Sequence, residues 1–299
     1  MKKAVSISIG SSKRNKSVEI ELLGEKVSIE RIGTDGDMEK AAQLFGELDG
    51  KVDAFGVGGA DLGLMVDGRW YPIHSVQRLV RYIKTTPVVD GAGLKNTLEG
   101  KIAPFIDRQL GHLLKKRTAF VTMGSDRWGM SSSFVKAGYE CTFGDLMFTA
   151  NIPIPVHSLS ALKIVVAVLA PVLTRLPFEW LYPIGEAQEK RVPKWESYYQ
   201  AAEVIAGDCH YIKRHMPARL DGKIIATNTT TTADLELFRQ AGVKALVTST
   251  PSLEGRTFGT NMMEAALVAV AGKGRPLTLP ELDSLLDQLE FEPQLQELN

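Results

Sequence analysis

The alternation of strand, glycine-containing turn, helix and strand that starts near Thr118 restricts the fold of this chain more than any other sequence feature. Parallel neighbours need crossover connections of this kind, because a tight turn can join only antiparallel strands. Five short apolar segments have this setting and are predicted to be parallel strands: residues 119–123, 140–143, 203–206, 223–226 and 244–248. The second half of the chain is therefore predicted to be a Rossmann-type parallel-sheet domain.

The length of 299 residues favours two domains, because one hydrophobic core rarely grows that large. We predict an α/β protein with an N-terminal mixed α/β substrate domain over residues 1–115 and a Rossmann-type dinucleotide-binding domain over residues 116–257. A helical insertion over about 151–200, broken into short helices by prolines, is expected to cover the edge of the second domain. Residues 258–299 are predicted to form C-terminal helices that pack back on the first domain and end in a frayed tail.

The first domain shows strand and helix patterns without a readable strand order. Polar and apolar residues alternate at 4–9, 18–22 and 27–32, which predicts three strands. Asp67-Gly68 predicts a tight hairpin between two short strands. A single longer helix is predicted from about 94 to 116.

Composition and charge exclude several classes of protein. Lys plus Arg and Asp plus Glu both number 35, so there is no positive excess to neutralise the phosphates of a nucleic acid. The most hydrophobic run, residues 164–173, contains Pro171 and is too short for a membrane span, so we expect a buried helix and no membrane partner. The alternating residues near the N-terminus do not resemble a signal peptide, which predicts a cytoplasmic protein.

A metal site is not expected from the cysteine and histidine spacings. Cys141 and Cys209 make neither a disulfide framework nor a four-ligand zinc site. Asp208, His210 and His215 are close in sequence, but their spacing fits no common metal site. The prediction is therefore that the chain binds no metal.

The turn after the first strand of the second domain is the predicted cofactor site. It reads Gly124-Ser125-Asp126-Arg127-Trp128-Gly129 and leads into a helix. Glycines in such a turn let the backbone approach a pyrophosphate at the N-terminus of the helix. The residues predicted to contact the cofactor are Gly124, Ser125, Asp126, Arg127 and Gly129.

Asp145 ends the next strand, 21 residues after Gly124. This is close to the offset of about 20 residues at which an acid binds the adenosine ribose in dinucleotide-binding folds. An acid there favours NAD, although Arg127 could hold the additional phosphate of NADP. The alternative is an ordinary β-α-β unit in which Asp145 only caps a helix.

Two later strand ends are also predicted to line the site, because open α/β sheets bind ligands beyond their carboxyl edge. Asn228, Thr229 and Thr230 follow the fourth strand and are predicted to contact the nicotinamide or the substrate. Helix capping explains one or two of the threonines but not the whole run. Arg256, in a glycine-flanked loop, is a candidate to hold a substrate carboxylate, with a solvated loop arginine as the alternative.

Polar residues at two strand ends of the first domain are candidates for substrate chemistry. Asp61 follows the glycines of residues 56–59 and is a predicted substrate ligand. Asp90, Lys95 and Asn96 bring a carboxylate, an ammonium and an amide into one loop and helix start. Such a group can perform general acid-base work on a hydroxyl. The alternative is that Asp90 caps the helix and Lys95 is solvated.

Several segments resemble a bacterial family labelled quinate 5-dehydrogenase, or quinate/shikimate dehydrogenase-like, over nearly the whole chain. They are Thr86-Pro87-Val88-Val89-Asp90-Gly91, Gly93-Leu94-Lys95-Asn96-Thr97-Leu98-Glu99, Phe143-Gly144-Asp145-Leu146-Met147-Phe148, Thr227-Asn228-Thr229-Thr230-Thr231 and Gly255-Arg256-Thr257-Phe258-Gly259-Thr260-Asn261. The resemblance implies a substrate domain, then an NAD(P) domain, then a helix that returns to the first domain. It also implies a Lys and Asp pair at the substrate hydroxyl.

Two hypotheses follow from these observations. The first is an NAD(P)-dependent oxidoreductase acting on a small polar hydroxy or keto compound, in which Lys95 moves the hydroxyl proton, Asp90 assists and Arg256 holds a carboxylate. The second is a nucleotide- or metabolite-binding protein without redox chemistry. The expected partner is a small-molecule substrate, and a homodimer is compatible with the sequence. The substrate, the reaction direction and the choice between NAD and NADP stay open.

Overall fold

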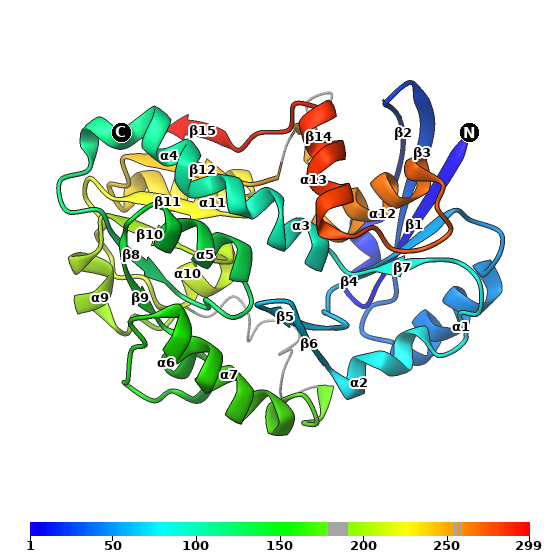
Figure 1. Ribbon diagram of the computed structural model, residues 1–299, viewed down its shortest axis with the longest axis horizontal. Helices are drawn as coiled ribbons and strands as arrows, with labels where there is room; N and C mark the ends of the chain where they lie inside the picture. The colour runs from blue at the N-terminus through cyan, green and yellow to red at the C-terminus, as the bar shows by residue number, and fades with distance from the viewer. Residues whose placement is uncertain (179–190, 251, 254–255, 258) are drawn as a thin grey trace.

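The computed structural model of the chain describes residues 1–178, 191–250, 252–253, 256–257 and 259–299. Two β-sheets form the centres of two lobes that lie side by side (Figure 1). The first lobe is built around a five-stranded sheet and the second around a six-stranded sheet. Parallel pairs predominate in both sheets, so the chain has a mixed α/β architecture.

The first sheet contains the three strands that the alternating patterns near the N-terminus predict and two further strands. They are β1 (Lys2–Ser8), β2 (Lys16–Leu22), β3 (Glu25–Gly33), β4 (Ala54–Gly58) and β7 (Val88–Val89). β1 lies between β3 and β4 and is parallel to both, and β7 extends the parallel part beyond β4. β2 pairs with β3 in the antiparallel direction through a turn at Leu23 and Gly24.

Helices cover both faces of the first sheet, because neighbouring residues of its strands belong to different cores. Val5 and Phe55 pack toward α1 (Met38–Leu48), whose Phe45 meets Phe55 edge to face with ring centroids 5.1 Å apart. Ala4 and Ala54 pack toward α12 (Thr260–Ala271), which brings the C-terminal part of the chain onto this lobe.

The second sheet contains the five parallel strands that the sequence predicts. They are β8 (Thr118–Val121), β9 (Glu140–Phe143), β10 (Val204–Ala206), β11 (Ile224–Thr227) and β12 (Ala245–Thr248), and β15 (Gln294–Glu297) is added at the edge. The order is β15-β12-β11-β10-β8-β9. The parallel strands thus follow the flavodoxin-like order 2-1-3-4-5 rather than the 3-2-1-4-5-6 order of the usual dinucleotide-binding sheet.

Both sheets have a topological switch point beside their first strand. In the second sheet the chain passes from β8 to β9 on one side and then to β10 on the other. In the first sheet β3 and β4 flank β1 in the same way. Loops at the carboxyl ends of such strands diverge and leave space for a ligand, so each lobe presents a candidate binding edge.

The remaining elements connect and cover these sheets. They are η1 (Ser12–Arg14), β5 (Gly63–Val66), β6 (Arg69–Pro72), α2 (His74–Gln77), η2 (Arg78–Val80), α5 (Trp128–Lys136), α6 (Asp145–Ala150), α9 (Glu196–Ala201), α10 (Cys209–His215), α11 (Thr232–Gln240), β13 (Ser252–Leu253), β14 (Arg256–Thr257) and α13 (Leu279–Gln288). β5 and β6 form the hairpin predicted from Asp67-Gly68.

The predicted long helix between residues 94 and 116 is wrong. The segment is divided into α3 (Ala92–Asn96), η3 (Leu98–Lys101), α4 (Ile102–Leu110) and η4 (Gly111–Leu113), and it carries the chain from the first lobe to the second (Figure 1). The break falls at Thr97, whose hydroxyl donates a hydrogen bond of 2.9 Å to the carbonyl oxygen of Gly93. Back-bonding of this kind competes with the helical ladder and bends the chain.

The predicted frayed C-terminal tail is also wrong. β15 pairs with β12 in the antiparallel direction, and Leu298 is buried. An uncovered β12 would present a row of unpaired backbone groups, and the tail satisfies them. The C-terminal segment therefore contacts both lobes, α12 in the first and β15 in the second.

The hydrophobic run in the insertion forms α7 (Leu159–Leu173), one longer helix where short helices were expected. Only one of its faces is buried, through Leu162 and Val166, whereas Ile164 and Val168 are each 66% exposed. The prediction of a buried helix is therefore wrong. Among the residues that the structure describes, no helix is long and apolar enough to cross a membrane.

The contact between α12 and β4 generates a prediction about Gly56. A Cβ atom at this position would lie 2.8 Å from the backbone oxygen of Asn261, so Gly56→Ala should destabilise the fold by about 1–3 kcal/mol, the usual cost of overpacking. Gly111→Ala is the matched control, because a Cβ atom there meets nothing within 4 Å. Urea denaturation would measure both variants, and equal unfolding midpoints would contradict the close approach.

Candidate active site

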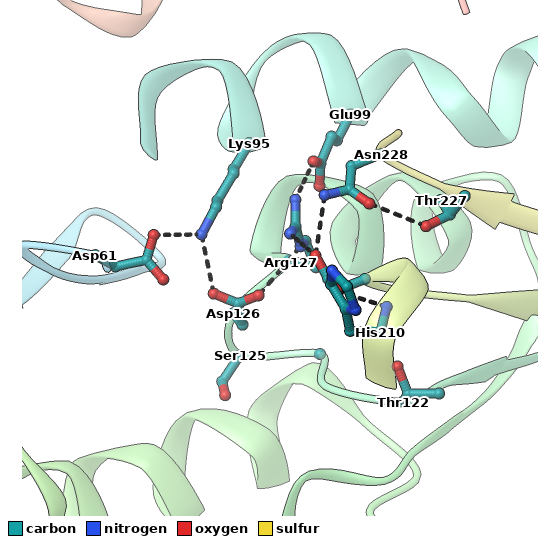
Figure 2. Close-up of polar contacts among 12 residues, drawn as sticks. Asp61, Lys95, Glu99, Thr122, Ser125, Asp126, Arg127, His210, Thr227 and Asn228 are labelled. Atoms are coloured by element: carbon teal, nitrogen blue, oxygen red, sulfur yellow. Dashed lines mark hydrogen bonds and ion pairs between the residues drawn. The ribbon is translucent and has the colours of Figure 1, made fainter. Parts of the chain in front are cut away.

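The candidate site lies where loops from the carboxyl ends of both sheets meet. The loop after β4 carries Asp61 and the loop after β8 carries Asp126 and Arg127, whereas Lys95 and Glu99 come from the segment that connects the lobes. Figure 2 shows these side chains pointing toward one another. The topology thus brings together charged groups that are far apart in the sequence.

Lys95 joins the two lobes through its ammonium group. Its Nζ atom lies 2.7 Å from Oδ1 of Asp61 and 3.1 Å from Oδ1 of Asp126 (Figure 2). The side chain of Lys95 is only 9% exposed. The alternative of a solvated lysine is therefore wrong, and Lys95 lies at the carboxyl edge of the second sheet.

Arg127 forms the second centre of positive charge. Its guanidinium donates to Oε1 of Glu99 at 2.5 Å and to Oδ2 of Asp208 at 2.7 Å, and its Nε atom lies 3.1 Å from Oδ2 of Asp126. The side chain is 4% exposed. The guanidinium of Arg127 is thus paired within this buried cluster, and its contact with the additional phosphate of NADP, considered from the sequence, stays a prediction.

Asn228 extends the cluster toward β11. Its amide nitrogen donates to Oδ2 of Asp208 at 2.9 Å, and its amide oxygen accepts from the Thr227 hydroxyl at 3.1 Å. Thr229 and Thr230 lie half-exposed in the following loop. Thr231 caps α11, which accounts for one threonine of the run.

Burial, together with an excess of carboxylates over cations, shifts the protonation of the acids in the cluster. Four acids, Asp61, Glu99, Asp126 and Asp208, surround Lys95 and Arg127. Burial raises the pKa of Asp61 to about 6 and that of Glu99 to about 7, although the neighbouring cations oppose these shifts. Burial also acts on Asp126, but Lys95 and Arg127 outweigh it and hold the pKa of Asp126 below its ordinary value.

The same charges keep Lys95 protonated. Burial alone would lower the pKa of Lys95, but Asp126 and Asp61 raise it above its ordinary value. Lys95 is therefore suited to donate a hydrogen bond to a substrate oxygen and to stabilise negative charge on it. Asp61 can take up or release a proton near neutral pH.

Asp90 and Asn96 do not join this cluster. The carboxylate of Asp90 accepts from the backbone amides of Leu62 at 2.6 Å and Ala92 at 3.0 Å. The amide of Asn96 donates to the carbonyl of Ala92 in its own helix at 2.8 Å. Asp90 thus holds the loop that presents Asp61, and Asp61 takes the place beside Lys95 that the sequence analysis gave to Asp90.

The carboxylate of Asp145 is hydrogen-bonded to the backbone of the predicted cofactor loop. Its two carboxylate oxygens accept from the backbone amides of Gly124 and Ser125, each at 2.9 Å. The carboxylate of Asp145 thus accepts the hydrogen bonds of the backbone amides that were predicted to bind a pyrophosphate. Asp126 adds a further negative charge to the same loop. The predicted contact of Asp145 with a ribose is therefore replaced by contacts within the chain, and binding of a dinucleotide at this loop stays a prediction.

The glycines of this loop have packing functions. A Cβ atom at Gly129, which lies within α5, would be 2.4 Å from the backbone oxygen of Lys95. A Cβ atom at Gly124 would be 2.6 Å from the ring of Phe143. Gly129 thus allows α5 to approach α3, the helix that carries Lys95.

The backbone of Arg256 belongs to β14. Its side chain, predicted to hold a substrate carboxylate, lies outside the described part of the structure, as do residues 251, 254–255 and 258. No group of three or more metal-binding side chains occurs in the described part of the chain. His215, considered as a metal ligand, has its Nδ1 atom 2.7 Å from the carbonyl oxygen of Val192.

Asp208, Glu99 and Glu264 were not among the residues predicted for the site. Asp208 follows the end of β10 and could have been found by the strand-end rule that selected Asp61. Glu99 and Glu264 lie within helical segments and carry no such signal. Glu264 is 4% exposed and accepts from the Leu94 amide at 3.2 Å, so it supports the helix that carries Lys95.

The burial of Glu264 predicts a pH-dependent stability. Burial raises its pKa from 4.5 to about 8 in the folded chain, so the stabilisation is complete below pH 4.5 and is lost as the pH rises toward 8. Glu264→Gln should flatten this part of the pH profile of unfolding, whereas Glu21→Gln, on the exposed face of β2, should not. Urea denaturation between these pH values measures the effect, and parallel profiles for the chain and Glu264→Gln would disprove the assignment.

Comparisons with solved structures give only weak likenesses. An NAD-dependent malic enzyme from Thermotoga maritima is 14% identical, with a TM-score of 0.42, and the match covers 95% of this chain and 75% of that one. A Mycobacterium smegmatis protein in complex with beta-D-fucofuranose is 9% identical, with a TM-score of 0.35 and coverage of 100% and 92%. A galactofuranose binding protein is 11% identical, with a TM-score of 0.36 and coverage of 98% and 94%. These values carry no argument about function.

Sequence comparison with protein families is more informative about membership. No curated protein matches the chain. Residues 3–90 match a family described as a domain of unknown function, DUF8753, and residues 93–298 match a second, DUF8754. The boundary between the two matches falls at the loop before α3, where the chain leaves the first sheet. Since the second match spans more than half of the sequence, the chain belongs to the DUF8754 family.

Proposed function

We propose that the chain binds a small polar hydroxy or keto compound between its two sheets and performs acid-base chemistry on the oxygen of that compound. The observation that carries the proposal is the buried ammonium of Lys95, held between Asp61 of the first lobe and Asp126 of the second. A buried charged group of this kind is a candidate functional group where it lies at the carboxyl edge of a sheet, because α/β proteins bind ligands there.

The proposed roles follow from protonation. An ammonium has three hydrogens, and within the described residues Lys95 has two acceptors, so one hydrogen is available for a substrate oxygen. Lys95 would stabilise the negative charge that develops on this oxygen, and Asp61 would accept the hydroxyl proton. In the reverse direction Asp61 returns the proton to the oxygen.

If the bound compound is also oxidised or reduced by NAD(P), the chain is the NAD(P)-dependent oxidoreductase considered from the sequence. The position of the site beside the switch point of the second sheet favours it, because nucleotides bind there in doubly wound folds. The occupied amides of Gly124 and Ser125 argue against a pyrophosphate in that loop, so no step is derived through a dinucleotide. The alternative is a metabolite-binding protein without chemistry.

Ligand-binding measurements distinguish the oxidoreductase from the metabolite-binding protein. Calorimetry of the full chain with quinate, shikimate and malate, each with and without NAD or NADP, should detect binding of a hydroxy compound in the absence of dinucleotide. A change in nicotinamide absorbance during incubation would establish the oxidoreductase. Binding without any chemical change would establish the alternative.

Lys95→Met should lower turnover of the bound compound by about 10²- to 10³-fold, the usual effect of removing one donor that stabilises developing negative charge. Lys163→Met is the matched control, because this lysine is exposed and pairs with Asp67 on the surface. Unchanged turnover in Lys95→Met would remove the lysine from the chemistry.

The raised pKa of Asp61 predicts how the reaction depends on pH. Because its pKa is raised to about 6, the basic form disappears below that pH, and kcat/KM for the hydroxy compound should rise through pH 6 to a plateau. Asp61→Asn should abolish this limb together with most of the activity. A profile that is flat across pH 6 would contradict the role of Asp61.

A further inference from the structure

A hollow away from the candidate active site is lined by residues of α1, α2 and η2 and by residues 175–178. The end of α7 and α2, which border it, lie close together in Figure 1. The volume of the hollow is about 570 Å³, within the range of small-molecule sites. One wall comes from the first lobe, from the start of α1 and from α2 and η2, and the other from residues 175–178 after α7. The His74 amide donates to the Thr174 carbonyl at 2.9 Å and joins the two walls.

The hollow is rich in positive charge. Arg78, Arg81 and Arg175 line it together with His74, and Glu39 is the acid among the described lining residues. Both oxygens of Glu39 are engaged by Arg81 at 2.5 Å. Within the described part of the chain, the guanidinium of Arg78 has no ion pair or hydrogen bond, and that of Arg175 has a carbonyl partner, Pro171, but no carboxylate. Two guanidinium groups thus remain for an anion.

A buried hydroxyl and an apolar wall complete the hollow. The Oγ atom of Ser75 is buried and has no hydrogen-bond partner among the described residues, an arrangement that costs free energy unless a ligand supplies the partner. Met38, Leu176 and Pro177 provide apolar surface beside the charged groups. The combination suits a ligand with an anionic end and an apolar body.

The charge of this hollow is local. The chain as a whole carries 35 basic and 35 acidic residues, and the cluster around Lys95 contains more carboxylates than cations. The cations of the candidate active site are thus already paired with carboxylates, whereas the hollow offers guanidinium groups without a carboxylate partner among the described residues. Arginine pairs with phosphate and carboxylate through two parallel hydrogen bonds, which provides a geometric basis for selection.

We propose that this hollow, bounded by α1, α2 and residues 175–178, is a binding site for a small organic anion, a phosphate ester or carboxylate with an apolar body. Arg78 and Arg175 hold the anionic group, and Ser75 donates a hydrogen bond to it. Because its two walls come from different lobes, the ligand also links the lobes. This site is independent of the chemistry assigned to Lys95.

Calorimetry of the full chain with phenyl phosphate, benzoate and inorganic phosphate tests the proposal. We expect phenyl phosphate to bind more tightly than inorganic phosphate, because only the former fills the apolar side. Phenyl phosphate tighter than benzoate identifies a phosphate site, and the reverse identifies a carboxylate site. No binding of any of the three at millimolar concentration overturns the proposal.

Variants locate the binding. Arg78→Gln and Arg175→Gln should each weaken binding by about tenfold or more, the effect of losing a charge-assisted hydrogen bond. Arg239→Gln, which removes an exposed arginine paired with Glu236 on α11, and Lys95→Met should leave the affinity unchanged. Urea midpoints confirm that each variant is folded, and Arg78→Lys, which keeps the charge, should recover part of the affinity. A loss in Lys95→Met without a loss in Arg78→Gln and Arg175→Gln would place the anion in the other site and overturn the proposal.

Discussion

The buried guanidinium of Arg127 lies at the centre of the candidate site and links the connecting segment to the second lobe. It contacts Glu99 from the connecting segment, Asp126 from its own loop and Asp208 from the loop after β10. Taking charges out of water costs several kcal/mol per ion, and removing one partner of a buried pair typically costs about 3–5 kcal/mol, because the other charge is left uncompensated. The loops can therefore occupy only positions that keep all these charges paired.

The same cluster determines what the candidate site can do. Lys95 closes it on the side of the first lobe, so that the loops after β4 and β8 are held against one ammonium. The acid that shares this ammonium, Asp61, is kept in place by the contact of Asp90 with the Leu62 amide. Carboxylate oxygens accept hydrogen bonds, so the acids of the cluster favour a ligand that donates them, which agrees with a hydroxy compound.

The candidate site and the hollow beside α2 differ in their charge. At the start of α5 the backbone amides of the loop are neutralised by Asp145, an anion of the chain itself. Positive charge without carboxylate partners collects instead beside α2 and the end of α7. A chain with no net charge can thus present an acidic site between its sheets and a basic hollow at their side.

Local patterns in the sequence predicted many of the elements of the fold, although not the breaks between residues 94 and 116 or the last strand. The strands around Thr118, the hairpin at Asp67-Gly68 and the helix from Thr260 follow from periodicity and turn chemistry, which act between near neighbours. The strand-end rule also selected Asp61, Asp126 and Asn228, because the carboxyl edge of a parallel sheet is a property of the strand itself.

The order of the strands, the ion pairs of the charged side chains and the pairing of residues 294–297 with β12 were decided by the tertiary structure. The sequence contains no local signal that places Asp61 rather than Asp90 beside Lys95, because the choice depends on loops from two sheets. The spacing of Asp145 from Gly124 is the same for an acid that binds a ribose and for one that binds its own loop, and only the direction of the carboxylate separates them. Similarly, residues 294–297 become a strand because the edge of β12 is open to them, an interaction that lies almost fifty residues away in the sequence.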